Sequence, residues 1–230
     1  MLIGGLQKLT LIDYPGKVAC TIFTVGCNFR CPFCYSGELV LPEKQITEIS
    51  EKDIFNFLKE RQGLLDGCVI CGGEPTINED LPDFIIKIKK LGYLVKLDTN
   101  GSSPEMLEYL IINKMVDYVA MDIKSSRAKY SVYTGRKVDL AKIERSINQL
   151  KKNEVSFEFR TTVAPGLTAE DILAIAEWIS GPGVNYFLQK FVPEKELLDP
   201  EILKQVILAE EEILSSIEAI RGRFKNSKLR

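Results

Sequence analysis

Histidine is absent from this chain of 230 residues. The absence removes the commonest general base and the commonest nitrogen ligand for metals. Any chemistry must therefore use thiolates, carboxylates, lysine, arginine or a bound cofactor. The chain also has no apolar run that approaches the roughly 20 residues of a membrane span, and it begins without a signal-peptide pattern. We therefore expect no membrane association and place the protein in the cytoplasm.

An excess of one charge is also missing, because 30 basic residues stand against 32 acidic ones. The formal net charge of -2 does not favour nucleic acid or an anionic membrane as a partner. A hydrophobic content of 45% predicts one domain over residues 1–230 with a substantial core.

Short apolar or β-branched runs alternate with helical patterns from about residue 18, which predicts βαβ units and a parallel sheet. The expected strands cover residues 18–25, 68–71, 93–98, 118–123, 156–163 and 186–191. Eight such repeats close a full barrel in about 250 residues. Six repeats in this length predict an α/β fold with a partial, open (β/α)6 TIM-like barrel.

Capping residues and turn residues mark where elements begin and end. Ser50 and Thr168 each precede an aspartate by three residues, and Ser103 precedes a proline, which predicts three helix starts. The turn sequence Asp-Tyr-Pro-Gly predicts an N-terminal hairpin within residues 1–17. We expect the last helix over 200–220 and a solvated, frayed basic tail over 221–230.

Three cysteines, Cys27, Cys31 and Cys34, lie close together directly after the first predicted strand. All six cysteines fall in the first third of a chain that is too long to need disulfide staples, so metal or redox use is favoured. Soft thiolates select zinc or iron-sulfur clusters. Three thiolates on a 4Fe-4S cluster would leave one iron open for a chelating ligand, as a catalytic site requires.

A structural zinc site completed by Cys68 or Cys71 is an alternative, because these two residues have CxxC spacing. Alternation along a strand argues against it, since residues three apart point to opposite faces. The preferred interpretation treats both residues, and Cys20, as small buried hydrophobes.

Polar residues follow the predicted strands, at the end where a barrel places its active site. After the second strand come Gly72, Gly73, Glu74 and Pro75. The glycines permit close backbone approach, and the glutamate is an acceptor for an ammonium group. An ordinary strand-ending turn would explain the glycines and the proline but would leave the glutamate without a role.

Further candidate site residues follow the next strands: Asp98, Thr99 and Asn100 after the third, Asp122 and Lys124 after the fourth. Alternatively, residues 100–101 form only a turn, and Asp122 and Lys124 form only a local ion pair. Arg160 lies in an otherwise apolar strand and needs a partner. A carboxylate of a cofactor would supply one.

The CxxxCxxC spacing, with Phe33 before the third cysteine, resembles the signature of the radical S-adenosylmethionine (SAM) superfamily. This resemblance implies one 4Fe-4S cluster on the three cysteines, Phe33 beside the adenine, and the Gly-Gly-Glu motif at residues 72–74 around the amino group of SAM. It also implies an oxidoreductase reaction. One electron from the reduced cluster cleaves SAM to methionine and a 5'-deoxyadenosyl radical, which abstracts a hydrogen atom.

The chain resembles in particular the activating proteins of anaerobic ribonucleoside-triphosphate reductase and, more broadly, the glycyl radical enzyme activases. The matching stretches are residues 7–8, 13–17, 26–32, 38–39, 72–76, 98–101, 121–124, 160 and 163–166. The resemblance implies a glycyl radical enzyme as protein substrate and a flavodoxin-like one-electron donor. No cysteine follows Cys71, so we expect none of the auxiliary clusters of related enzymes.

Two departures from the family and two alternative functions stay open. Tyr35 and Ser36 stand where the family has histidine and asparagine, and a late barrel histidine is missing, with Gln189 or Lys190 as substitutes. One alternative is a radical SAM enzyme with a small-molecule substrate, as in the 7-carboxy-7-deazaguanine synthases. The other is a non-catalytic metal-binding or electron-carrier module.

Overall fold

The computed structural model describes residues 1–41, 46–192 and 196–230. Its centre is an eight-stranded sheet in which the strands lie in chain order. The strands are β1 (Ile3–Thr10), β2 (Ala19–Thr24), β3 (Gly67–Gly72), β4 (Leu94–Thr99), β5 (Tyr118–Asp122), β6 (Ser156–Val163), β7 (Asn185–Lys190) and β8 (Asn226–Leu229). β1 is antiparallel to β2, and every later pair is parallel. The open α/β barrel and its six predicted strands are thus confirmed.

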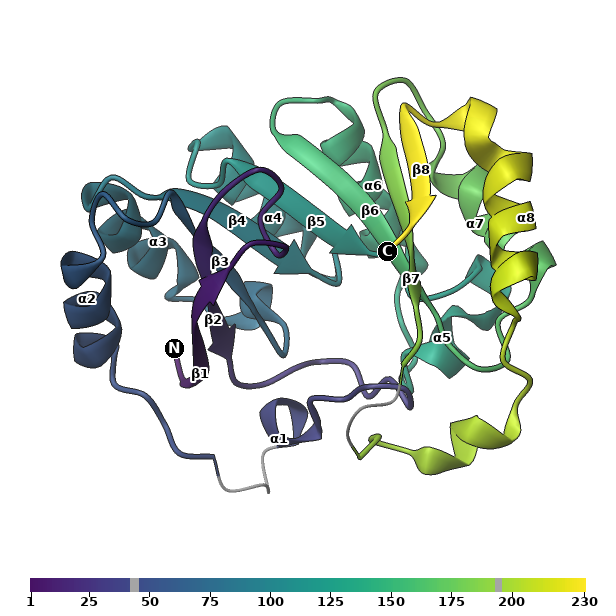
Figure 1. Ribbon diagram of the computed structural model, residues 1–230, viewed down its shortest axis with the longest axis horizontal. Coiled ribbons are helices and arrows are strands. Elements are labelled where there is room, and N and C mark those ends of the chain that lie inside the picture. Colours follow the sequence, from purple (N-terminus) through teal and green to yellow (C-terminus); the bar gives the residue numbers. More distant parts are fainter. Residues whose placement is uncertain (42–45, 193–195) are drawn as a thin grey trace.

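Helices connect the strands and cover the outer side of the sheet (Figure 1). They are α1 (Gly37–Val40), α2 (Glu51–Glu60), α3 (Leu81–Lys90), α4 (Pro104–Ile112), α5 (Tyr130–Tyr133), α6 (Leu140–Lys151), α7 (Ala169–Ile179) and α8 (Glu210–Ile220). Ser50 and Thr168 cap α2 and α7 as predicted, each accepting a hydrogen bond from the amide three residues on. Ser103 precedes α4 without a side-chain cap bond. No helix within the described ranges is long and apolar enough to cross a membrane.

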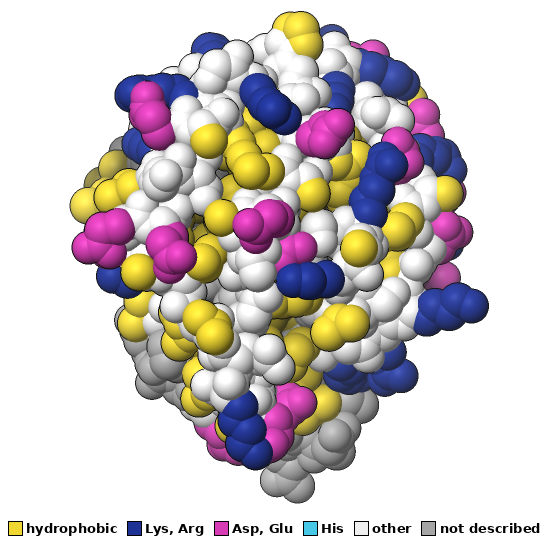
Figure 2. All heavy atoms as spheres, turned by 90° about the vertical axis from the view of Figure 1, so that its right-hand side faces the viewer, with side chains coloured by type: hydrophobic (Ala, Val, Ile, Leu, Met, Phe, Trp, Pro, Cys, Tyr) yellow, Lys and Arg dark blue, Asp and Glu magenta, His cyan; other side chains and the backbone are white. Residues whose placement is uncertain are grey.

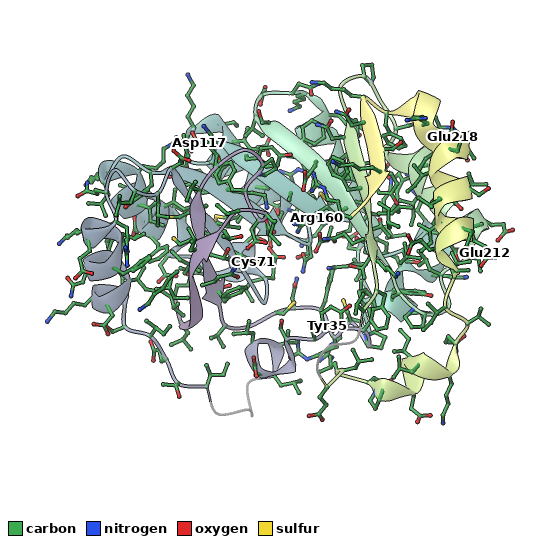
Figure 3. The ribbon with its side chains drawn as sticks, viewed as in Figure 1. Tyr35, Cys71, Asp117, Arg160, Glu212 and Glu218 are labelled. Atoms are coloured by element: carbon green, nitrogen blue, oxygen red, sulfur yellow. The ribbon has the colours of Figure 1, made fainter. Side chains whose placement is uncertain are left out.

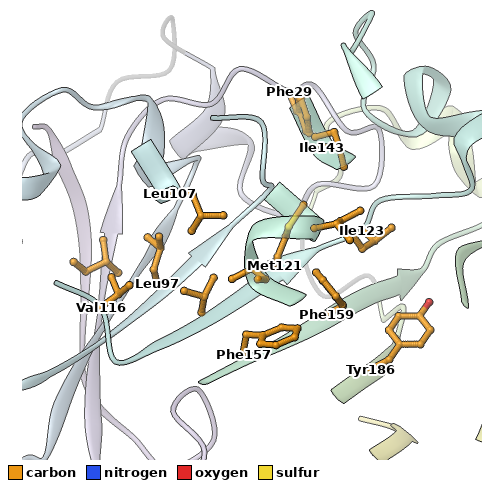
Figure 4. Packing of buried hydrophobic residues seen from close by; sticks show 14 of the residues in the cluster. Phe29, Leu97, Leu107, Val116, Met121, Ile123, Ile143, Phe157, Phe159 and Tyr186 are labelled. Atoms are coloured by element: carbon orange, nitrogen blue, oxygen red, sulfur yellow. The ribbon is translucent and has the colours of Figure 1, made fainter. Parts of the chain in front are cut away.

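Alternation along the strands separates the hydrophobic core from the barrel interior. Leu97, Met121 and Phe159 are fully buried on neighbouring strands, on the side of the helices (Figure 4). The next residue on each of these strands is charged and points to the other side. The same alternation that builds the core therefore places Asp98, Asp122 and Arg160 inside the barrel.

The turn between β1 and β2 closes the barrel at the end opposite to the strand C-termini. Tyr14 in this turn is 4% exposed, packs with Ala19 and Val69, and lies 6.0 Å from the ring of Tyr118 between centroids. Gly16 adopts a φ of 69°, which glycine tolerates without a steric penalty. The hairpin extends beyond the predicted residues 1–17, because its second arm is β2, the first barrel strand.

Two expectations for the C-terminal part were wrong. Residues 200–220 do not form one helix: a 3-10 turn (Pro200–Lys204) is followed by α8. The basic tail is not frayed, because β8 pairs with β7. Arg230 donates to the buried Glu158 at 2.9 Å and lies 3.4 Å over the ring of Phe187, so a buried acid and an aromatic face hold this basic segment.

We predict that Tyr14→Ala lowers the free energy of unfolding of the cluster-free chain by about 3 kcal/mol, because it empties a packed site inside the barrel. Denaturant unfolding followed by circular dichroism measures the change. Tyr109→Ala is the matched control, since Tyr109 is 49% exposed on α4. Equal losses in the two variants would contradict a stabilising role for the buried side chain of Tyr14.

Candidate active site

One cavity of about 220 Å³ lies at the C-terminal ends of the strands. It brings together every site residue predicted from the sequence except Pro75: Cys27, Cys31, Phe33, Cys34, Gly72, Gly73, Glu74, Asp98, Thr99, Asn100, Asp122, Lys124 and Arg160. Pro75 is buried at the start of a short 3-10 turn behind Glu74. The cavity is also lined by six residues that were not among the predicted site residues: Phe29, Tyr35, Ser36, Val40, Cys71 and Thr162.

The cysteine loop begins in direct backbone contact with the Gly-Gly-Glu turn. The amide of Gly73 donates to the carbonyl of Thr24 at 2.9 Å, and the amide of Glu74 donates to the carbonyl of Gly26 at 2.8 Å. A Cβ atom on Gly73 would lie 1.9 Å from the Gly26 carbonyl oxygen. The close approach predicted for these glycines is therefore an approach to the chain's own cysteine loop, which it ties to Glu74.

Glu74 is 1% exposed, and its carboxylate accepts four hydrogen bonds. One oxygen accepts from the Thr99 hydroxyl at 2.6 Å and from the hydroxyl and amide of Thr76, and the other accepts from the Asn100 amide at 2.6 Å. Burial nevertheless raises the pKa of Glu74, although these hydrogen bonds oppose the rise. An ammonium group in the cavity would relieve the cost of this buried negative charge.

The inner face of the barrel carries a chain of alternating charges. Lys96 contacts Asp98, Arg160 bridges Asp98 at 2.8 Å and Asp122 at 2.9 Å, and Lys124 contacts Asp122 at 2.9 Å. Burial would raise the pKa of Asp122, but Arg160 and Lys124 hold it below its usual value. This series of five charges has a cation at each end, so it carries one excess positive charge. The excess favours a carboxylate ligand.

This arrangement contradicts the role predicted for Arg160 and confirms the ion pair considered for Asp122 and Lys124. Arg160 does not need a cofactor carboxylate as its partner, because its guanidinium already donates to Asp98 and Asp122. The local ion pair considered for Asp122 and Lys124 exists, but it belongs to the larger chain of charges and lines the cavity. Figure 3 shows Arg160 and Cys71 in the middle of the barrel.

The cysteine loop is held closed by its own arginine and by two neighbouring segments. The Arg30 guanidinium donates to the carbonyls of Cys27 and Phe29 at 2.6 and 2.8 Å. The Arg30 amide donates to Thr134 at 2.7 Å. From the other side, the amide of Leu198 donates to the carbonyl of Cys34 at 3.1 Å.

The three cysteines fit a cluster better than a single zinc ion. Thiolates on one zinc converge to about 2.3 Å from a common point. No such group of three ligands occurs in the described ranges, whereas all three thiols line one cavity, as separate irons of a cluster require. Burial raises the pKa of Cys27 to about 11 and that of Cys31 to about 12, so loading the site releases protons.

The fourth ligand that a zinc site would need is also not offered by Cys68. Its sulfur lies 3.6 Å from that of Cys20 on the neighbouring strand, and both residues are fully buried on the helix side. Cys71 differs from the expected buried hydrophobe, because it lines the cavity near Asp98 and Arg160. Cys71 lies two residues after Val69 on the same strand, and Val69 faces the barrel interior. Strand alternation could therefore have predicted this placement.

The two departures from the family pattern meet on one side of the site. Tyr35 stacks on Phe191 at 5.6 Å between ring centroids, and its hydroxyl accepts from the amide of Val192 at 3.1 Å. Gln189 and Lys190 do not line the cavity, and Lys190 pairs with Glu210 at the surface. An aromatic stack therefore occupies the side for which we expected a polar substitute.

Residues 21–179 match the family model of the radical SAM superfamily, and the chain belongs to this superfamily. It therefore binds a 4Fe-4S cluster and SAM, and it is a radical SAM enzyme. One relative is a Methanocaldococcus jannaschii protein to which the name glycyl-radical enzyme activating enzyme has been assigned. It is 38% identical over 218 residues, which are 92% of this chain and 88% of the relative.

More distant relatives include a GTP 3',8-cyclase of Aquifex aeolicus, which is 22% identical over 90% of this chain and 66% of its own length. Among solved structures, SuiB of Streptococcus suis bound to SAM matches with a TM-score of 0.68 at 15% identity. The match covers 90% of this chain and 48% of SuiB, so the chain spans about half of that protein. TYW1 matches with a TM-score of 0.59 at 17% identity, over 90% of this chain and 74% of that one. These likenesses confirm the fold.

We predict that Gly73→Ala weakens SAM binding by about tenfold or more, because the new methyl group displaces the cysteine loop from Glu74. Equilibrium binding of SAM and iron content after anaerobic reconstitution measure the effect. Gly222→Ala is the control, since a Cβ there meets no atom within 4 Å. Normal SAM affinity in Gly73→Ala would show that the close approach is dispensable.

We also predict that SAM affinity decreases as the pH is lowered. The raised pKa means that Glu74 becomes protonated at a higher pH than an ordinary glutamate, and only its charged form pairs with an ammonium. Glu74→Gln should bind SAM about tenfold or more weakly, with a flatter pH profile. Calorimetry between pH 6 and 8 tests this, with the exposed Glu79→Gln as control. An unchanged pH profile in Glu74→Gln would assign the titration to another group.

Proposed function

We propose that this radical SAM enzyme is a glycyl radical enzyme activase and that its partner is an anaerobic ribonucleoside-triphosphate reductase. The observation that carries the activase proposal is the 38% identity to a relative of that name over 92% of this chain. An alignment of this extent includes the walls of the cavity as well as the cysteine loop. The choice of reductase rests on the stretch from residue 7 to residue 39, which resembles its activating proteins.

Each wall of the cavity has a separate task in this function. Cys27, Cys31 and Cys34 hold the cluster. When the cluster and SAM are bound, they supply the radical that removes a hydrogen atom from the substrate. Glu74 receives the ammonium of the methionine moiety, and Lys124, which lines the cavity and pairs with Asp122, receives its carboxylate.

The open sheet provides access for a protein substrate. The strand order runs from β1 to β8, and within the described residues no strand pairing closes it into a ring. A backbone glycine lacks a side chain that would extend into a deep site, so its loop must enter the cavity itself. The open side of the sheet leaves room for such a loop beside the strand ends.

The alternative with a small-molecule substrate has weaker support. The GTP 3',8-cyclase named above is 22% identical, against 38% for the relative named as an activase. No observation on the cavity selects a purine over a peptide loop. The activase proposal is therefore the better supported one.

We predict that the reduced, reconstituted enzyme with SAM produces a glycyl radical on an anaerobic ribonucleoside-triphosphate reductase. Electron paramagnetic resonance detects the doublet of the radical, and chromatography detects 5'-deoxyadenosine. The triple variant with alanine at Cys27, Cys31 and Cys34 should retain no iron and give neither product. Formation of 5'-deoxyadenosine without a glycyl radical, with a reductase that another activase can activate, would reject this partner.

A further inference from the structure

A second cavity, of about 180 Å³, lies on the outer surface over the segment between the first two cluster cysteines. It is lined by Asn28, Phe29, Ser102, Arg136, Lys137, Val138, Asp139 and Lys142. Phe29 lines both this outer cavity and the active-site cavity. The side chain is 4% exposed and lies beside Ile143 of α6 (Figure 4). One aromatic residue therefore stands between the surface and the cysteines.

The outer cavity is positively charged. Arg136, Lys137 and Lys142 are exposed, and none of them forms an ion pair with another described residue. The one carboxylate in the lining, Asp139, is engaged as the cap of α6, where it accepts from the Ala141 amide at 3.0 Å. By contrast, acidic and basic side chains are interspersed on the face that carries α8 (Figure 2). The lining thus holds three cations and one carboxylate, whereas the whole chain has a net charge of -2.

The basic residues are held in a fixed position relative to the cysteine loop. The Thr134 carbonyl accepts from the Arg30 amide, and a Cβ on Gly135 would lie 2.1 Å from the Arg30 carbonyl oxygen. On the other side of the cavity, the Asn28 amide group donates to Ser102 at 2.8 Å. A partner that binds the basic residues is thereby placed over Phe29.

We propose that this outer cavity is the docking site of an acidic one-electron carrier protein, and that the electron enters the active site past Phe29. The step moves one electron from the reduced carrier to the oxidised cluster, and no bond forms or breaks. Complementary charge speeds such encounters and makes them sensitive to salt. The proposal rests on the proposed function, which requires an electron at the cluster held by the cysteines. It does not depend on which glycyl radical enzyme is the substrate.

The test compares two variants that change the net charge equally. Arg136→Glu with Lys137→Glu reverses the charge of the outer cavity, whereas Lys52→Glu with Lys59→Glu reverses exposed charges on α2. The probe is a reduced flavodoxin of negative net charge, mixed with the oxidised, cluster-loaded enzyme in stopped flow without SAM. A second measurement follows binding of the same flavodoxin to the cluster-free chain by calorimetry.

We expect the Arg136 and Lys137 variant to lower the second-order rate constant of reduction by about tenfold or more at low salt. Its salt dependence should flatten, and its affinity in the cluster-free state should fall by a similar factor. Reduction by dithionite and iron content should stay normal, which excludes misfolding. The α2 variant should match the wild type.

Two results would overturn the docking site. One is a rate constant that stays unchanged, or that falls equally in the α2 variant. The other is normal reduction by flavodoxin combined with impaired radical transfer to the reductase by dithionite-reduced enzyme, which would assign the cavity to the glycyl partner. Failure of the activase proposal looks different, since flavodoxin would reduce the wild type normally and no glycyl radical would form.

Discussion

The backbone pairing between residues 24–26 and residues 72–74 is the constraint on which the site depends. It continues the parallel pairing of β2 and β3 beyond the end of the regular strands. Because no side chain fits between Gly73 and the Gly26 carbonyl, the two segments approach as closely as backbones can. The loop with the cysteines and the turn with Glu74 are thus one unit, so that a ligand bridging cluster and glutamate meets a preset distance.

Electrostatics inside the barrel follow from the same principle of mutual support. Lys96, Asp98, Asp122 and Arg160 lie on three adjacent strands, with Lys124 two residues beyond the end of β5, and each carboxylate contacts two cations. An unpaired charge in this interior would be costly. Removing one of these charged side chains would therefore leave its partners buried without an opposite charge. The charges are therefore fixed before a ligand arrives, and little side-chain reorganisation accompanies binding.

The sequence predicted the parts of the molecule that depend on local pattern. The six strands follow from apolar runs, and the site residues converge because parallel strands end at one edge, which needs no knowledge of packing. Contacts between distant segments were not predictable. β8 is held by Glu158 and Phe187, whose inward orientation no local signal in residues 221–230 reveals. Arg160 was assigned to a cofactor because its two aspartate partners lie on other strands.

The closure of the cysteine loop by Arg30 has a consequence for the life of the protein under oxygen. The guanidinium binds carbonyls of the loop itself, and Thr134 and Leu198 hold it from outside, so none of these contacts involves iron. We therefore expect a chain that has lost its cluster to oxidation to keep the shape of its cysteine loop. Once the cysteines are thiols again, iron and sulfide could rebuild the cluster without renewed folding of the polypeptide.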